Sequence, residues 1–246
     1  NTASPVICKP LAHGAAIVMH SLTKYIGGHG TSIGGIVVDG GNFDWTKNRK
    51  RQPLLNEPDQ SYGGAVWIDA VPQLTGANIP FVIRLRVVLL RDTGAPLAPF
   101  NAWQIIQGLE TVGLRMKQHC SNAEKVVTFL ETQKKVQNVI YPTNHQGEIK
   151  ERAKKYMQGG YGSLVGMDVG TKENGAKFID NLKMLYHVAN IGDARSLAIH
   201  PATTTHSQLN EKELLAAGVT PGYVRLSIGI EHPDDIIADI KQALAA

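Results

Sequence analysis

Short apolar segments bounded by glycine and polar residues recur along the chain, and each predicts a buried strand. Two lie near the start, AAIVMH at 15–20 and GIVVDG at 35–40, and both are rich in aliphatic residues. The second half contains four more, at 138–142, 163–169, 196–200 and 223–230. Helical patterns separate these segments, so strands and helices are expected to alternate.

Apolar residues at helical spacing predict a long helix in the middle of the chain. Ile105, Leu109, Val112 and Met116 recur every three or four residues and would share one face. Asn101 is the expected N-cap, and the helix should continue, with a bend, to about residue 131. Further helices are predicted around 85–89 and at 173–188, 210–218 and 232–246.

These elements predict an α/β fold in two parts. The part before the long helix should contain the two strands near the start. Residues 101–246 should form the connecting helix and a smaller α+β domain. Within the first part, residues 42–66 are polar and predict a loop or insertion. A chain of 246 residues is long enough to bury a substantial core.

Composition limits the classes of function. Hydrophobic residues make up 43% of the chain and charged residues 19%, as in globular proteins. No apolar stretch approaches the roughly 18 residues that span a bilayer. The net charge is only +4, and the one basic cluster, KNRKR at 47–51, has no aromatic residues among it. We therefore expect neither a membrane nor a nucleic-acid partner.

The two cysteines, Cys8 and Cys120, are far apart and belong to no CxxC pattern. Widely spaced cysteines of this kind are typical of reduced thiols in a cytoplasmic protein. A disulfide is the less favoured alternative. The expected localisation is therefore cytoplasmic.

The segment SLTKYIGGH, at 21–29, carries the first candidate for chemistry. Lys24 follows Ser21 and Thr23 and precedes a loop with glycine at five of the nine positions 27–35. In an extended segment the two hydroxyls would point to one side. A lysine amine fixed beside a carbonyl group can form a Schiff base, whereas an exposed lysine on a flexible turn is the plainer alternative.

Arg225, in YVRLSIGI, is the second candidate. Strand alternation places Val224, Leu226 and Ile228 on one face and Arg225 on the other, beside small residues. An arginine with open space above it can bind a carboxylate through two parallel hydrogen bonds. An ordinary surface arginine remains the alternative.

The segment 189–207 contains two histidines, His200 and His206. No cysteine or carboxylate cluster with a recognised ligand spacing accompanies them. A turn followed by a strand and a polar loop is therefore expected, and no metal site.

These three stretches, in this order, resemble the pyridoxal-phosphate (PLP)-dependent Cys/Met metabolism enzymes of fold-type I. SLTKYIGGH resembles the cofactor-lysine motif of that family, and IGDARSLAIHPATTTH, at 191–206, resembles its substrate-loop motif. VRLSIGIE, at 224–231, resembles its carboxylate-arginine strand, and the opening Asn-Thr at 1–2 resembles the end of its D-N-T motif. The resemblance covers essentially the whole chain.

Within the family, three further stretches are most similar to the O-acetylhomoserine sulfhydrylase branch. They are GGHGTSIGG at 27–35, the polar insert at 44–64 and PFNAWQIIQGLETVGLRM at 99–116. On this resemblance, the fold is α/β, and residues 1–100 would be the C-terminal part of the PLP-binding large domain, with part of its mostly parallel sheet. Residues 101–246 would be the connecting helix and the C-terminal domain.

The resemblance implies a role for each candidate residue. Lys24 would form the Schiff base with pyridoxal 5'-phosphate and later move protons. Ser21 and Thr23 would bind the cofactor phosphate. The implied substrate-binding residues are Arg225, for the α-carboxylate, and Asn190 and Thr205. The aspartate that pairs with the pyridine nitrogen in the family would precede Asn1, as would the rest of the N-terminal part.

The implied reaction is γ-replacement by a transferase of sulfur amino-acid biosynthesis. Sulfide or a thiol would replace the acetate of O-acetyl-L-homoserine and give homocysteine or methionine. A cystathionine γ-synthase, a methionine or cystathionine γ-lyase, and a non-catalytic fragment remain alternatives. The resemblance also implies a homotetramer with sites shared between subunits.

Overall fold

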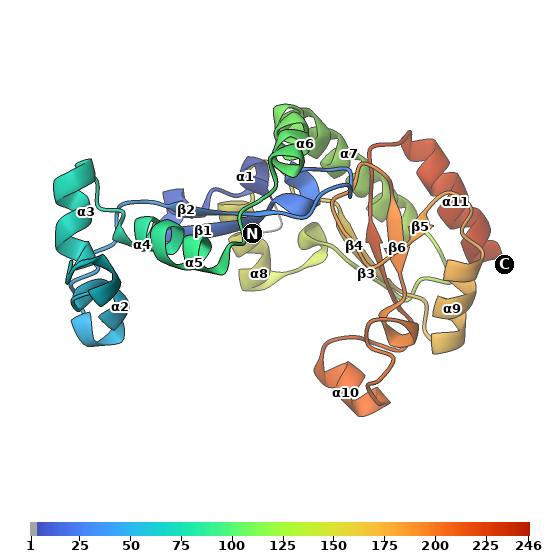
Figure 1. The fold of residues 1–246 in the computed structure, drawn as a ribbon. Helices are drawn as coiled ribbons and strands as arrows, with labels where there is room; N and C mark the ends of the chain where they lie inside the picture. The colour runs from blue at the N-terminus through green and yellow to red at the C-terminus, as the bar shows by residue number, and fades with distance from the viewer. Residues whose placement is uncertain (1–3) are drawn as a thin grey trace. The chain divides into compact units, whose positions relative to one another are not determined.

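The computed structural model describes residues 4–246, which divide into two compact units (Figure 1). The first unit comprises Lys9–Ser21 and Gly34–Ala102. The second comprises 4–8, Leu22–Ile33 and Trp103–Ala246. The segment that contains Lys24 therefore groups with the C-terminal half of the chain. The Asn-Thr resemblance at 1–2 lies outside the described residues.

The first unit contains a pair of antiparallel strands. β1 (Ile17–Ser21) pairs with β2 (Gly35–Asp39), with Ile17 opposite Asp39. The mostly parallel pairing that the resemblance implies therefore does not hold for β1 and β2. Parallel neighbours need a crossover element, usually a helix, and the segment between these strands has only one helical turn. The prediction of a buried strand is also wrong for β2, which is exposed or half-buried throughout.

The rest of the first unit is built from turns and short helices. The predicted polar insert holds only turns and the short helix α2 (Pro53–Asn56). It is followed by α3 (Trp67–Thr75) and by a continuous helix made of α4 (Pro80–Arg84), Leu85–Leu90 and α5 (Arg91–Thr93). The core of the unit consists of Trp45, Leu55, Trp67, Ile68 and Val71.

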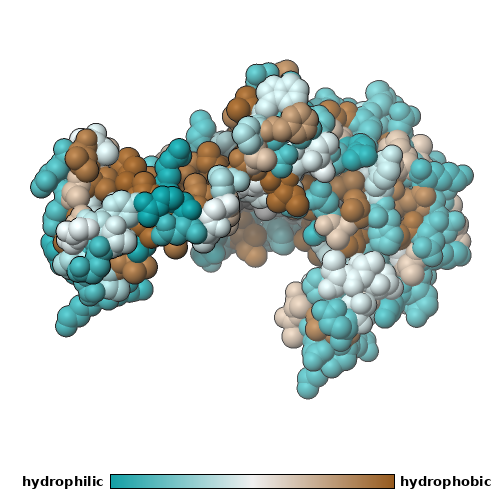
Figure 2. All heavy atoms as spheres, in the orientation of Figure 1, coloured by the Kyte–Doolittle hydropathy of each residue, from teal (hydrophilic) through white to brown (hydrophobic). Residues whose placement is uncertain are grey.

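Apolar side chains also lie at the surface of the first unit, as Figure 2 shows. Among them are Met19, Ile36, Leu54, Leu74 and Leu89. Among residues 4–246, no single helix is long and apolar enough to cross a membrane. One bent pair, 67–75 with 80–93, reaches that length and composition only when its members are taken together.

The long central helix is two helices. α6 (Pro99–Glu110) and α7 (Val112–Glu131) are separated at Thr111, which gives the predicted bend its position. Asn101 is not the N-cap: α6 begins at Pro99, and the Ala98 carbonyl accepts the first helical hydrogen bond from Ala102. Proline suits the first helical position because its missing N–H would have no partner there.

The second unit is organised around a five-stranded sheet in the order β3-β4-β7-β6-β5. Its strands are β3 (Asn138–Ile140), β4 (Leu164–Asp168), β5 (Tyr186–His187), β6 (Leu197–Ile199) and β7 (Tyr223–Ser227). All neighbours are antiparallel except β5 and β6. The other helices are α1 (Ser4–Ile7), α8 (Gly147–Tyr156), α9 (Lys172–Asp180), α10 (Glu211–Ala216) and α11 (Pro233–Ala245).

The core of the second unit lies between the sheet and the helices α7, α9 and α11 (Figure 1). Val224, Leu226 and Ile228 are fully buried, as the alternation in YVRLSIGI predicts, and they pack with Ile236 and Ile240 of α11. The strand that carries Arg225 is therefore fixed by one face in this core.

The helix predicted over 173–188 ends early. α9 stops at Asp180, and Tyr186–His187 forms the strand β5 instead. The carboxylate of Asp239 accepts hydrogen bonds from the backbone N–H groups of residues 183, 184 and 185, at 2.9–3.0 Å. These bonds replace helical ones, so a contact 54 residues away in sequence overrides the local helical pattern.

Candidate active site

Lys24 lies in a tight turn directly after β1. Residues 22–26 form one helical turn, closed by hydrogen bonds from Gly27 N to the Leu22 carbonyl, at 2.9 Å, and from Gly28 N to the Lys24 carbonyl, at 2.8 Å. The extended conformation assumed from the sequence is therefore wrong. The turn is possible because residue 27 is glycine: an added Cβ there would lie 2.7 Å from the Leu22 carbonyl oxygen.

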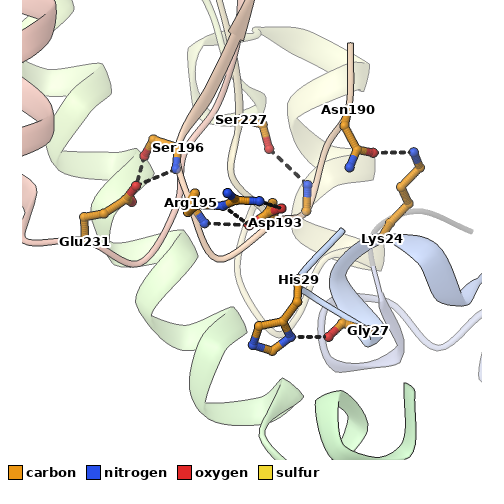
Figure 3. Close-up of polar contacts among 10 residues, drawn as sticks. Lys24, Gly27, His29, Asn190, Asp193, Arg195, Ser196, Ser227 and Glu231 are labelled. Carbon is orange, nitrogen blue, oxygen red and sulfur yellow. Dashed lines mark hydrogen bonds and ion pairs between the residues drawn. The ribbon is translucent and has the colours of Figure 1, made fainter. Parts of the chain in front are cut away.

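The structure brings three of the predicted site residues together, Lys24, Asn190 and Arg225. Figure 3 shows the first two of them. The Nζ of Lys24 donates a hydrogen bond to Oδ1 of Asn190 at 2.6 Å. Nη2 of Arg225 donates to the backbone carbonyl of the same Asn190 at 3.3 Å. Asn190 thus links the amine and the guanidinium, although these are separated by 201 positions in the sequence.

Arg225 is placed by the register of the sheet. It is opposite Gly166 of β4 and Ile199 of β6, and its side chain is half-buried. Because Val224 and Leu226 point into the core, Arg225 must point to the other face. The fixed strand therefore aims its guanidinium at the loop that carries Asn190.

That loop, 189–196, forms hydrogen bonds with both the strand that carries Arg225 and the segment that carries Lys24. Its Gly192 N–H donates to the hydroxyl of Ser227 at 3.1 Å, at the end of β7. Its Ala194 N–H donates to the carbonyl of Gly28 at 2.8 Å, next to the Lys24 turn. The loop is thereby positioned against the lysine segment and the arginine strand at once.

Charged groups stabilise the same loop from within (Figure 3). The buried carboxylate of Asp193 accepts hydrogen bonds from the backbone and the guanidinium of Arg195, at 3.0–3.2 Å. Burial acts to raise the pKa of Asp193, but the bonds to Arg195 outweigh it and the pKa is lowered. Glu231 accepts from the N–H and the hydroxyl of Ser196.

The other predicted site residues lie differently. Thr23 is half-buried in the Lys24 turn. Ser21 is the last residue of β1, opposite Gly35, in the first unit. Thr205 is exposed, and its hydroxyl bonds Nδ1 of His206 at 2.9 Å. The described contacts of Thr205 do not bring it to Lys24 or Arg225, so its role in substrate binding stays a prediction.

A buried polar cluster around Tyr25, the residue after Lys24, is not among the sites predicted from the sequence. The hydroxyl of Tyr25 bonds that of Ser163 at 2.8 Å, and burial raises the pKa of Tyr25. The ring of His119 meets Tyr25 edge-on, with 5.3 Å between centroids, and its Nδ1–H donates to the carbonyl of Ile228 at 2.7 Å. Burial lowers the pKa of His119 to about 4.

A sequence signal for part of this cluster did exist. Arg115, His119 and Asn122 recur at helical spacing on α7, and all three are buried. They lie on the same side of the helix as the apolar residues, where polar residues need partners. Buried polar residues at that spacing indicate a polar network behind the site.

The donor set fits a phosphorylated aldehyde that carries an amino-acid substrate. A primary amine, an adjacent hydroxyl on Thr23 and a guanidinium suited to a carboxylate are the groups that such a ligand needs. Within residues 4–246, no cluster of His, Cys, Asp or Glu could hold a metal ion. Both ring nitrogens of His200 have structural partners, Thr203 and the Pro221 carbonyl.

A lysine amine that can form a Schiff base and a half-buried arginine suited to a carboxylate fit the use of PLP on amino acids. A family model, Cys/Met metabolism PLP-dependent enzyme, matches residues 1–245. The chain belongs to this family.

Two relatives in particular indicate its place in the family. O-acetyl-L-homoserine sulfhydrylase of Leptospira meyeri is 50% identical over 246 residues, which cover 98% of this chain and 55% of the relative. A solved structure described as putative O-acetylhomoserine (thiol)-lyase of Campylobacter jejuni, with N'-pyridoxyl-lysine-5'-monophosphate, has a TM-score of 0.89 at 40% identity. It is matched over 100% of this chain and 57% of its own.

A more distant likeness is to cystathionine gamma-lyase of Lactobacillus plantarum, complexed with L-serine. Its TM-score is 0.75 at 28% identity, over 100% of this chain and 54% of that one. These neighbours confirm the predicted fold-type I class. The chain spans about half the length of the relatives it matches.

Proposed function

We propose that the protein carrying this chain is a PLP-dependent transferase that performs γ-replacement on O-acetyl-L-homoserine. Sulfide or a thiol replaces acetate, and the product is homocysteine or methionine. The observation that carries the proposal is the link from Lys24 Nζ through Asn190 to Arg225. It supports the proposal because a primary amine and a guanidinium, a group suited to a carboxylate, contact the same residue.

The relatives favour γ-replacement over elimination. The sulfhydrylase of L. meyeri is 50% identical to this chain, whereas the cystathionine gamma-lyase is 28% identical. Both share the fold, so the fold alone supports either reaction. The difference in identity supports the sulfhydrylase assignment.

Each residue of the site has a defined task in this proposal. Lys24 holds the PLP aldehyde through its Nζ and, when released, moves protons at that atom. Ser21 and Thr23 donate hydrogen bonds to the phosphate, and Arg225 binds the α-carboxylate of the substrate with two parallel donors. Asn190 and Thr205 contact the substrate. Bound PLP supplies the electron sink for the reaction.

The wider setting of the site belongs to the same proposal. Residues 1–100 form the C-terminal part of the PLP-binding large domain, and the enzyme is a cytoplasmic homotetramer with sites shared between subunits. The exposed apolar side chains of the first unit support an assembly, because apolar patches on a protein surface mark interaction sites.

Product analysis tests the proposal. The purified protein with PLP is incubated with O-acetyl-L-homoserine and sulfide, and separately with methionine or cystathionine alone. Homocysteine from the first mixture is expected to form much faster than keto acid from the others. Lys24→Ala should lower the rate by about a thousandfold or more. Keto acid as the main product would make the protein a γ-lyase instead.

A further inference from the structure

Arg115 carries a positive charge into the interior beside the lysine segment. Its side chain is 6% exposed. Among residues 4–246 no carboxylate forms an ion pair with it. A buried cation without a counter-ion is costly unless several hydrogen-bond acceptors surround it. The hydrogen-bond acceptors around Arg115 therefore indicate the role of this side chain.

Those acceptors are backbone carbonyls at the ends of two helical segments. Nη1 donates to the carbonyl of Tyr25 at 2.7 Å, and Nη2 donates to that of Ile26 at 3.0 Å. Nη2 also donates to the carbonyl of Gly108 at 2.6 Å, in the last turn of α6. The last carbonyls of a helix lack the regular helical partner and carry partial negative charge, so a guanidinium is favoured there. The Gly108 carbonyl also accepts from the N–H and the hydroxyl of Thr111, both at 3.3 Å.

The guanidinium of Arg115 makes its fourth hydrogen bond at the break between α6 and α7. Nε of Arg115 donates to the hydroxyl of Thr111 at 3.1 Å. Four donated hydrogen bonds thus join the residues directly after Lys24 to two points on the helices. A lysine side chain has only one nitrogen and cannot reach both sides together.

Two glycines leave just enough room for this arrangement. A Cβ at position 28 would overlap the guanidinium of Arg115, and one at position 108 would overlap the carbonyl of Gly27. The backbone of the lysine segment therefore packs directly on α6. Arg115 fills the remaining space between them.

We propose that Arg115 is a positioning residue for the reaction: its guanidinium fixes the backbone of Tyr25 and Ile26, so that the amine of Lys24 stays beside Asn190 and Arg225. The proposal rests on the function proposed for Lys24. A flexible lysine side chain can hold a reactive amine in place only if its backbone is fixed, because small displacements of a reacting group cost large factors in rate.

The test compares Arg115→Met and Arg115→Lys with Lys117→Met in the PLP-loaded protein. Lys117 is exposed on the same helix, so its variant controls for the loss of one positive charge. Three quantities are measured: kcat and KM for O-acetyl-L-homoserine, the pH titration of the visible cofactor absorbance, and hydrogen exchange over residues 22–33.

In Arg115→Met we expect kcat to fall about 10- to 100-fold, with KM changed by less than about threefold. The absorbance titration should shift, and exchange over 22–33 should rise. Arg115→Lys should lie between this variant and the wild type, and Lys117→Met should match the wild type. Added guanidinium ion should restore part of kcat in Arg115→Ala, since it fits the vacated space.

Other results would contradict the role proposed for Arg115. A folded Arg115→Met with wild-type kcat per bound PLP, titration and exchange overturns the proposal, even if its melting temperature falls. If Arg115→Met does not fold, the absence of any defect in Arg115→Lys and of guanidinium rescue overturns it. Failure of wild-type Lys24 to take up PLP instead contradicts the proposed function, while exchange over 22–33 still decides whether Arg115 fixes the segment.

Discussion

Lys24 and Arg225 meet at Asn190 but are held there by different kinds of structure. Arg225 lies in the middle of β7, between two strands, with fully buried neighbours on the opposite face. Lys24 lies in an irregular turn whose backbone is held by the side chain of Arg115 and by packing on Gly108. One residue depends on a regular sheet and its core, and the other on a few specific contacts.

Because of this difference, substitutions near Arg225 and substitutions near Lys24 should have different effects on stability and on the site. Damage to the sheet should lower the stability of the whole second unit, since its core is continuous from β4 to α11. Damage to the turn should misplace Lys24 at a smaller cost in stability. The substitutions that follow separate these two kinds of damage.

The largest effect is expected from Leu226→Ala, which removes a fully buried side chain next to Arg225. The substitution leaves a cavity in the core and should lower the free energy of unfolding by about 2–5 kcal/mol. Denaturant unfolding measures it. Leu114→Ala, at a position that is 76% exposed, is the matched control and should change stability by less than about 0.5 kcal/mol. Equal effects of the two would contradict the assigned core.

His119 connects the two sides, because it contacts Tyr25 by its ring and the end of the β7 segment through Ile228. Burial lowers its pKa to about 4 in the folded protein. Between pH 4 and about 6.5 the unfolded protein binds this proton more readily. The stability from the neutral ring is therefore complete above about pH 6.5 and is lost as the pH falls toward 4.

Between pH 7 and 4, protonation of His119 should lower the free energy of unfolding by up to about 3 kcal/mol. Unfolding measured from pH 7 to 4 checks it. His119→Gln should flatten the pH dependence, whereas the exposed His187→Gln should leave it as in the wild type. A wild-type slope in His119→Gln would show that other groups cause the acid sensitivity.

Arg225→Lys tests the sheet side without disturbing the core. A point charge replaces the two-donor fork, so binding of the substrate should weaken by on the order of 1.5–3 kcal/mol. Stability should stay close to that of the wild type. The measurement is KM for the amino-acid substrate or Kd for an unreactive analogue, with the exposed Arg152→Lys as control. Unchanged affinity would remove Arg225 from the carboxylate site.

Gly108→Ala tests the turn side. The new methyl group would overlap the Gly27 carbonyl, so the substitution should cost about 1–3 kcal/mol of stability and displace the Lys24 segment. Gly113→Ala is the matched control on α7: nothing lies within 4 Å of its Cβ, and it should stabilise the helix by about 0.5–1 kcal/mol. If both substitutions changed the free energy of unfolding in the same direction, Gly108 of α6 would not be closely packed against the turn.

The same contrast explains what the sequence could predict. Alternation in YVRLSIGI predicted both the strand and the face of Arg225, because one buried face imposes a period of two. No periodicity describes the turn at 22–26, so its extended conformation was predicted wrongly and only the motif SLTKYIGGH pointed to Lys24. The contact between Lys24 and Asn190 spans 166 positions and appears only in the folded chain.

Long-range contacts also account for the errors in the fold. The carboxylate of Asp239 draws residues 183–185 out of the predicted helix. The expected parallel pairing was wrong for β1 and β2 because only one helical turn connects them. The buried network of Arg115 and His119 had a signal in its helical spacing, but its partners on distant segments did not.

The most direct test of the account is to trap the amine of Lys24. The protein with PLP is reduced with borohydride, digested and mapped by mass spectrometry. We expect a phosphopyridoxyl group on the peptide that contains Lys24, and its loss in Lys24→Ala. A label on another lysine, or none on any peptide of this chain, would contradict the assignment of Lys24 as the residue that holds the cofactor.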